Sequence, residues 1–507
     1  MKKKGTVSLK NVDFYPKIME EVDFEDALDM AGMGRYQLQH CALMLATLST
    51  ALLEMIGNAF ILPAAACDLH LPDHLKGVVT SIPNIGIILT APIWGRAADS
   101  LGRKPALQLS TAAAGLLGLA AAFMPNLLGY ALCKLGASLF LSCPSSLGFA
   151  FAGELVPQRR RDKTLLLING FMVLSTTLSP VLAWFVLSTV PSFQIGPVTV
   201  LPWRVLTAVY AAPLILTSWW MTSALESPKF LMTKKKPHLA LECLKRIFAT
   251  NTAMFPEDFP VTRLRRQQDE GPATAATGLI SKARRDSLLR PPHLKWLALT
   301  GFLMFGLFTV LNGLFMFAPD VINRASAGPS EVSGTICSLL GQVEKSSAPA
   351  CPSSVSRATF VLMAATTAVY GLLVVAVSTS ALTKRHQVIG MFTTVAATCL
   401  VAGLSTNSTV QGVAMSALQL SSLGVGALAA YAVRLFPTTL RGTAVGAVLM
   451  CGRAGSVAGA NAAGYFLAVA CAHTFYGFTA LLCLCAALSF LLPKDEPTKP
   501  SEHIEMQ

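Results

Sequence analysis

Two ionisable side chains, Glu54 and Lys134, lie inside long apolar stretches of this 507-residue chain. A charge in the hydrocarbon core of a membrane is costly unless it is paired, hydrated or neutralised, so such residues mark transport paths or buried ion pairs. Asn58 follows Glu54 by four residues and shares its helix face. Glu54 is therefore a candidate for proton coupling or for contacting a positive group on a solute. The alternative is a structural pair with Lys134 that never contacts a solute; Lys134 can also extend toward the membrane surface.

A guanidinium lies in another apolar stretch, at Arg453. A fixed positive charge there would repel cationic solutes and attract carboxylates or sulfates. The alternatives are a structural partner for Glu54 or a role at a helix end. Asn312 and Gln419 are further polar residues within apolar stretches, and we expect them to line a solute path. Asn312 and Gly313 could break their helix beside that path, and the alternative is a notch for close helix packing.

A charged loop at residues 95–104 separates two apolar stretches. It contains, in order, Gly95, Asp99, Gly102, Arg103 and Lys104. Glycine permits a tight turn, and an acid is favourable at the positive N-terminal end of a neighbouring helix. We expect Asp99 to face the start of the eleventh apolar stretch and to form part of a gate. The alternative is a patch of positive charge that fixes orientation without gating.

A second charged segment follows the fourth apolar stretch and contains Glu154, Pro157 and Arg161. A proline after a helix end prevents its continuation, so we expect Pro157 to aim Glu154 back toward Arg103. These two side chains should pair.

The pattern at Pro157 and Arg161 returns 280 residues later at Pro437 and Arg441. An internal repeat of this length predicts two homologous halves. At the same offset the second copy lacks the acid and the arginine of the 95–104 loop, having threonine at both positions. We therefore expect the gate to be built mainly from the first half.

The elements that position these residues are apolar stretches long enough to cross a membrane. The chain is 53% hydrophobic and 13% charged, with a mean hydropathy of +0.55, whereas soluble proteins carry about 25% charged residues. A span needs about 20 apolar residues. The twelve predicted spans are 41–66, 75–97, 104–123, 127–152, 163–190, 201–224, 296–318, 359–382, 387–404, 409–433, 442–466 and 473–492. The fold class is thus an all-α membrane protein with two homologous six-helix bundles.

The basic residues predict the orientation. Of the 40 Lys and Arg residues, nearly all fall on the side that carries both termini, which is cytoplasmic by the positive-inside rule. The exceptions are Lys76, Lys134, Arg204, Arg324, Lys345, Arg357 and Arg453. The expected divisions are a tail (1–40), a first bundle (41–224), a linker (225–295), a second bundle (296–492) and a C-terminal tail (493–507). The membrane is either the plasma membrane or that of an intracellular vesicle.

The net charge of +13 lies on one membrane face, so nucleic-acid binding is not needed to explain it. The sequence shows no motif for an enzyme, a cofactor or a metal site.

Several motifs resemble those of the major facilitator superfamily. The 95–104 loop is similar to its signature G-x-x-x-D-x-x-G-R-[RK], and Glu154 opens a match to E-x-x-P-x-x-x-R. Glu226 begins Glu-Ser-Pro-Lys-Phe-Leu, which is similar to the end of span 6 in sugar-porter and organic-ion branches. The segment 24–37 resembles the lead-in of synaptic-vesicle-glycoprotein relatives. The resemblance implies a central cavity that opens to either side of the membrane in turn, with a charge selector at the position of Arg453.

The function expected is secondary transport of a small organic solute, an organic anion, with proton coupling through Glu54 as one form of it. The alternative is a non-transporting membrane protein with a binding or regulatory role. The partners implied are the solute, the lipid bilayer and, in the coupled form, H⁺. Cys337 and Cys351 share one external segment and could form a disulfide or remain free thiols.

Overall fold

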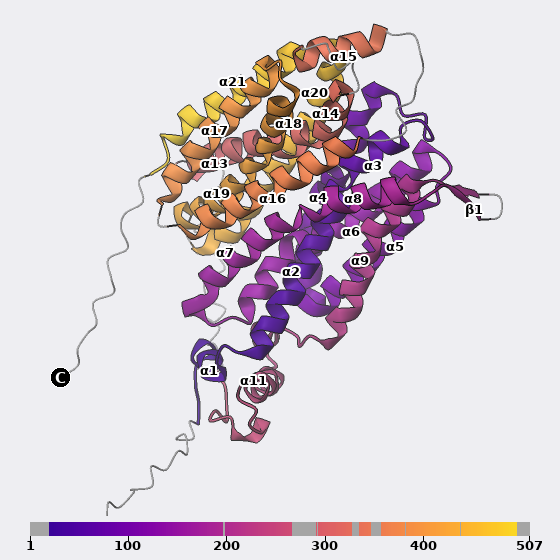
Figure 1. Ribbon diagram of the computed structural model, residues 1–507. Helices are drawn as coiled ribbons and strands as arrows, with labels where there is room; N and C mark the ends of the chain where they lie inside the picture. Colours follow the sequence, from indigo (N-terminus) through magenta and orange to yellow (C-terminus); the bar gives the residue numbers. More distant parts are fainter. Residues whose placement is uncertain are drawn as a thin grey trace, which may run out of the picture.

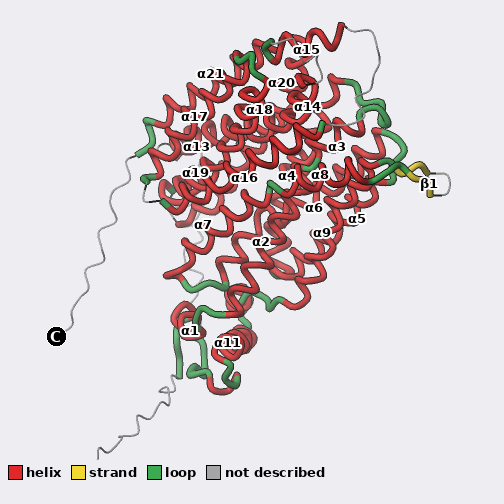
Figure 2. The backbone as a smooth tube through the Cα atoms, in the orientation of Figure 1, coloured by secondary structure: helices red, strands yellow, loops and turns green. Residues whose placement is uncertain are grey.

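Most apolar stretches form one long helix or two consecutive helices, and two stretches of the second bundle are interrupted by π- or 3₁₀-helical turns (Figure 1). The computed structural model describes residues 20–195, 198–265, 291, 293–326, 334–345, 356–380, 382–436 and 438–493. Within them, 12 helical segments are long and apolar enough to cross a membrane, which confirms the predicted number and fold class. Figure 2 shows how completely helical the described chain is.

The first six segments form one bundle. They are α2 (Arg35–Ile56) with α3 (Asn58–Ala65), α4 (Asp73–Leu101), α5 (Arg103–Ala122), α6 (Leu127–Glu154), α7 (Gln158–Ser175) with α8 (Leu178–Thr189), and α9 (Pro202–Trp220). A short antiparallel hairpin, β1 (Phe193–Ile195) and β2 (Val198–Val200), joins α8 to α9 and pairs Phe193 with Val200.

The second six segments form the other bundle. They are α13 (His293–Phe308) with a π-helical turn (Thr309–Gly313), a 3₁₀ turn (Leu314–Phe317) and α14 (Ala318–Ser326); α16 (Arg357–Thr379); α17 (Lys384–Leu404); α18 (Ser408–Ala417) with a 3₁₀ turn (Leu418–Ser421) and α19 (Ser422–Leu435); α20 (Thr438–Val469); and α21 (Cys471–Ser489). Between α14 and α16, α15 (Ile336–Lys345) lies at the end of the molecule opposite the 95–104 loop. We call that end the far end.

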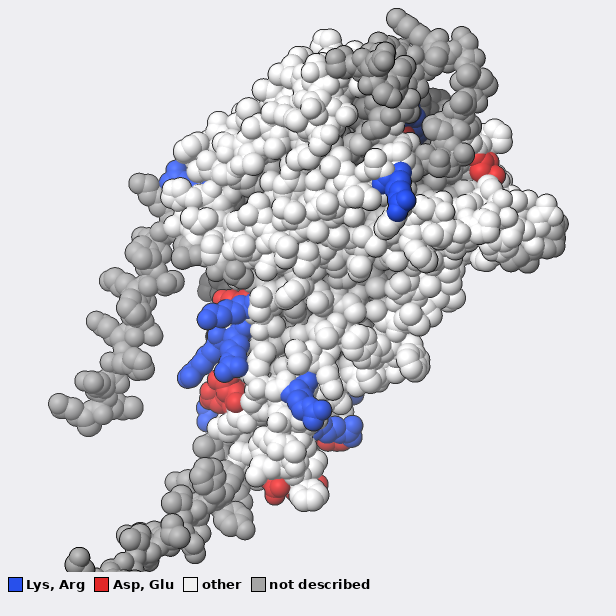
Figure 3. All heavy atoms as spheres, in the orientation of Figure 1, with Lys and Arg blue, Asp and Glu red and all other residues white. Residues whose placement is uncertain are grey.

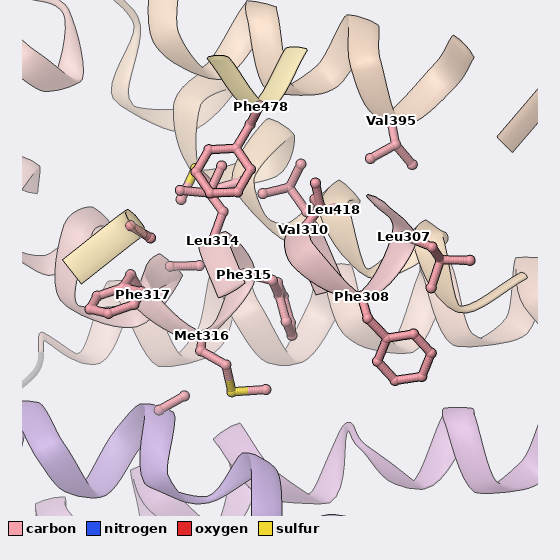
Figure 4. Packing of buried hydrophobic residues seen from close by; sticks show 14 of the residues in the cluster. Leu307, Phe308, Val310, Leu314, Phe315, Met316, Phe317, Val395, Leu418 and Phe478 are labelled. Atoms are coloured by element: carbon pink, nitrogen blue, oxygen red, sulfur yellow. The ribbon is translucent and has the colours of Figure 1, made fainter. Parts of the chain in front are cut away.

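The break at Asn312 and Gly313 combines both sequence expectations. The chain leaves the α-helix for a π-helical turn there, and a side chain at Gly313 would come within 2.7 Å of the backbone of Gly459 in α20. The glycine is therefore also a packing notch. Figure 4 shows the consequence: Leu314 points into the second bundle, while Phe315 and Met316 point toward the helices of the first.

Two helix pairs join the bundles. α4 packs along α20, and α7 with α8 packs along α16. Small residues bring the second pair close: a side chain at Gly371 would lie 3.0 Å from the Cα atom of Leu174. The candidate residues at the bundle junction are positioned by these two seams.

The described parts of the N-terminal tail (20–40) and of the linker (225–265) fold together at the lower end of the first bundle in Figure 1. α1 (Phe24–Ala31) and α11 (Pro237–Thr252) meet through Asn251, whose side chain donates to the carbonyl oxygens of Ala31 and Gly32 and accepts from the N–H of Tyr36 at 3.0 Å. Three shorter helices, α10 (Pro228–Thr233) and the 3₁₀ turns Met221–Ser223 and Pro256–Asp258, complete this tail–linker cap. Figure 3 shows Lys, Arg, Asp and Glu concentrated near it.

Both alternatives for Cys337, a disulfide with Cys351 and a free thiol, are wrong. Cys337 is bonded to Cys471 at the start of α21, with the two Cα atoms 5.5 Å apart. The pairing was missed because Cys471 lies 134 residues away in sequence and only the helix packing brings it beside α15. Cys351 lies outside the described residues. Cys67, which follows α3, is also disulfide-bonded.

Candidate functional site

The 95–104 loop forms a charge cluster on one end of the first bundle. Gly102 has a φ of +116°, a conformation that favours glycine, and makes the turn between α4 and α5. Arg103 lies 3.4 Å from Glu154 and 2.9 Å from Asp99. The predicted pairing of Arg103 with Glu154 is therefore confirmed. Lys104 donates to the backbone oxygens of Thr222 and Ala224.

Asp99 pairs with Arg103 four residues along its own loop, and its side chain is 74% exposed. The contact expected for Asp99 at the start of α20 involves residues whose side chains lie outside the described part of the chain, so it stays a prediction. Gly95 is exposed, with no neighbour within 4 Å of an added side chain.

Glu226 holds the backbone of the 95–104 loop. Its Oε1 accepts hydrogen bonds from the backbone N–H groups of Arg103 at 3.0 Å and Lys104 at 3.3 Å. These are the unpaired donors at the N-terminus of α5, where a carboxylate is favoured. The sequence marked Glu226 through its motif, but only the packing reveals its partner.

Arg161 ties this end to the N-terminal tail. It donates to Glu25 of α1 at 3.0 Å and to the carbonyl oxygen of Gly153 at 2.8 Å. Pro157 precedes α7 and separates it from α6. Pro437 lies outside the described residues; Arg441 is in α20, and its side chain is likewise outside them.

Glu54 and Lys134 form a dry ion pair inside the first bundle. Lys134 Nζ lies 2.5 Å from Glu54 Oε1, and the two side chains are 2% and 3% exposed. A side chain at Gly118 of α5 would lie 3.1 Å from Glu54, so α5 covers the carboxylate. Asn58 accepts from the Tyr130 hydroxyl at 3.0 Å. The arrangement matches the structural alternative, in which the pair joins α2 to α6.

Arg453 lies at the junction of the two bundles. It donates to Asn84 Oδ1 in α4 at 3.1 Å, and its guanidinium carbon lies 5.4 Å from the ring centre of Phe308. Among the described residues, no carboxylate lies within 4 Å of Arg453, and Glu54 pairs with Lys134 instead. The sequence reasoning missed Asn84. The signal available was an amide in the middle of the second apolar stretch.

A small cavity lies between the two bundles. It has a volume of about 10 Å³, and it is lined by Ile56, Ala59, Phe60, Thr176, Pro180, Phe315, Pro319, Met363 and Thr367. That is room for about one water molecule. Gln419 donates to Thr176 Oγ1 across the bundles at 2.6 Å, and its own Oε1 is buried without a partner in the described chain. Asn312 donates to Ser456 within the second bundle at 3.1 Å.

Comparisons place the chain among membrane transporters. The family model for the Major Facilitator Superfamily matches residues 43–383. The rat synaptic vesicle 2-related protein is 28% identical over 323 residues, covering 60% of this chain and 52% of that protein. Human synaptic vesicle glycoprotein 2A is 27% identical over 254 residues, covering 49% and 34%. The chain thus spans about half or less of the curated relatives it matches.

Solved structures show the same fold. A partially occluded, inward-open xylose transporter of E. coli matches with a TM-score of 0.60 and 15% identity, covering 90% of this chain and 99% of that one. A D-xylose-proton symporter matches with a TM-score of 0.60 and 14% identity, covering 90% and 98%.

Proposed function

Because this chain belongs to the major facilitator superfamily, we propose that it is a secondary active transporter of a small organic anion, working by alternating access between its two bundles. The observation that carries the proposal is the environment of Arg453. A guanidinium lies at the bundle junction with a neutral amide and an aromatic ring as its described neighbours.

The charge of Arg453 is not balanced by a nearby acid in the described chain. A guanidinium keeps its charge and offers several N–H donors in a plane that fits a carboxylate or sulfate. Asn84 accepts a hydrogen bond from one of those donors. The remaining donors of Arg453 are available to an anionic solute, and its positive charge disfavours a cation.

The polar residues at the junction are suited to the uncharged part of the solute. Thr176 lines the cavity, and Gln419 is bonded to it from the other bundle. The cavity is too small for an organic molecule in this conformation, so a solute would bind when the bundles separate there. Gln419 Oε1 would then be free to accept a donor from the solute.

We assign the Glu54–Lys134 pair a structural role in this mechanism. A proton carrier must exchange its proton with water or with the solute path, and both side chains are almost fully buried within the first bundle. Breaking such a pair leaves an uncompensated buried charge. Transport driven through Glu54 is therefore not part of the proposal.

The 95–104 end is proposed to face the cytoplasm, with both termini on that side. Most basic residues gather there, as the positive-inside rule requires. The disulfide between Cys337 and Cys471 lies at the opposite end, where an oxidising compartment permits it. The membrane would be the plasma membrane or that of a vesicle.

Uptake into proteoliposomes tests the function. The purified chain would be offered matched radiolabelled carboxylates, sulfates and quaternary amines, with and without a pH gradient. Saturable uptake of an anion, with cations excluded, supports the proposal. Uptake of none of the panel would favour the non-transporting role, and uptake of cations alone would contradict the assignment of Arg453.

A further inference from the structure

An ion pair crosses between the bundles at the far end. Lys76, in the first turn of α4, lies 3.1 Å from Asp320 Oδ2 in α14, and the two side chains are only 9% and 17% exposed. A partly buried pair is screened less by salt and water than an exposed one. It therefore contributes to holding α4 against α14.

Asp320 is oriented from within its own bundle. Its other oxygen, Oδ1, accepts from Arg324 Nε at 3.0 Å, four residues along the same helix. Arg324 orients the Asp320 carboxylate from within the second bundle, and Lys76 contacts it from the first bundle. Separating the bundles at this end would break the contact of Lys76 with Asp320 and keep that of Arg324 with Asp320.

The backbone beside Lys76 is tightly seated on the other bundle. A side chain at Gly77 would lie 2.6 Å from the carbonyl oxygen of Ala460, and one at Gly464 would lie 2.7 Å from the Cα atom of Gly77. Such a close approach requires small residues. The seam continues inward to Ser81, which accepts from Asn461 at 3.4 Å.

Aromatic contacts close the rest of this end. The rings of Phe60 in α3 and Phe360 in α16 are 6.0 Å apart, and the Arg357 guanidinium lies 5.4 Å from the ring centre of Trp184 in α8. Each joins one bundle to the other. By contrast, the described ion pair of Arg103 with Glu154, beside the 95–104 loop, lies within the first bundle.

We propose that the Lys76–Asp320 pair is the lock that keeps the far end closed, and that its loss shifts the bundles toward a conformation open at that end. The inference rests on the alternating access proposed above, but it requires no knowledge of the solute. The proposed lock depends on the positive charge at position 76, so Lys76→Arg should preserve the ion pair with Asp320.

Hydrogen–deuterium exchange of the full chain in lipid nanodiscs tests the lock. In Lys76→Gln and in Asp320→Asn, backbone exchange in 75–84 and 318–326 should rise about three- to tenfold, as expected for a modest population shift. Exchange in 145–154 and 426–435, at the opposite ends of α6 and α19, should fall in the same samples. Lys76→Arg should resemble the parent.

Arg324→Gln is the matched control, because it removes the contact of Asp320 that stays within one bundle. Its effect at the far end should be smaller than that of Lys76→Gln. Unchanged exchange in both Lys76→Gln and Asp320→Asn would overturn the lock. So would a rise at the far end without the reciprocal fall, because that pattern means local loosening. The two proposals can fail separately. If the exchange data contradict the lock but the parent still takes up anions, the transport proposal is unaffected.

Discussion

Asn84 Oδ1 accepts a hydrogen bond of 3.1 Å from the Arg453 guanidinium, which joins α4 of the first bundle to α20 of the second. Asn84→Asp changes one atom of that amide and supplies a carboxylate at the same place. We expect it to pair with Arg453 and to raise the KM for an anionic solute about tenfold, because a charge-assisted pair competes with the solute. Concentration-dependent uptake measures this. Asn84→Ala removes the hydrogen bond to Arg453 without adding a carboxylate, so it should change KM by much less. Equal effects of the two variants would contradict the claim that the charge of Arg453 binds the solute.

The pair of Glu54 with Lys134 should matter for stability. Removing one partner leaves a buried charge, so Lys134→Met should lower the free energy of unfolding by about 3–5 kcal/mol. Thermal unfolding in detergent measures the loss. The double variant Glu54→Leu with Lys134→Met should recover much of it, because neither charge is then buried. A double variant less stable than both single variants would show that the pair does more than join α2 to α6.

The Glu226 carboxylate should stabilise the turn before α5. Glu226→Ala leaves the N–H groups of Arg103 and Lys104 without their acceptor, and we expect a loss of about 1–3 kcal/mol. Glu242→Ala is a control on the same side of the molecule, since its pair with Arg246 is exposed and such pairs contribute about 0.5 kcal/mol or less. Thermal unfolding that ranks the two variants in the opposite order would contradict the anchoring role.

The disulfide between Cys337 and Cys471 should be detectable as a cross-linked peptide. Digestion without reduction should release a fragment that joins Cys337 to Cys471. Cys337→Ser and Cys471→Ser should each reduce stability by about 2–4 kcal/mol, and the double variant should lose no more than either. A fragment joining Cys337 to Cys351 in its place would contradict the packing of α15 beside α21.

Cys243 of α11 should react slowly with alkylating reagents. Burial raises the pKa of its thiol to about 11, and the thiolate is the reactive form. At pH 8 the native protein should therefore be alkylated at Cys243 far more slowly than the unfolded one, with the rate rising steeply toward pH 11. Mass spectrometry of that peptide over a pH series checks this. Equal rates in native and unfolded protein would show that α11 is not packed as described.

The sequence predicted what depends on local composition. Hydropathy alone located the twelve spans, since a membrane helix needs a continuous apolar run, and the proline after Glu154 was enough to direct that side chain to Arg103. The Glu54–Lys134 pair could be anticipated because each charge needed a partner, although the sequence could not exclude a solute in that place.

Features that depend on how distant helices meet were not predictable in this way. Cys471 became the partner of Cys337 only through the way in which distant helices pack at the far end. Asn84 was overlooked since a single amide in an apolar run carries no pattern. Its contact with Arg453 depends on the α4–α20 seam.

The central claim is that the charge of Arg453 selects the solute. The direct measurement is uptake of a matched anion and cation by the parent, Arg453→Lys and Arg453→Asp in proteoliposomes. We predict that Arg453→Lys keeps anion uptake. In Arg453→Asp the rate of anion uptake should fall at least about tenfold, and the cation should no longer be excluded. Anion uptake by Arg453→Asp with the KM and rate of the parent would contradict the account.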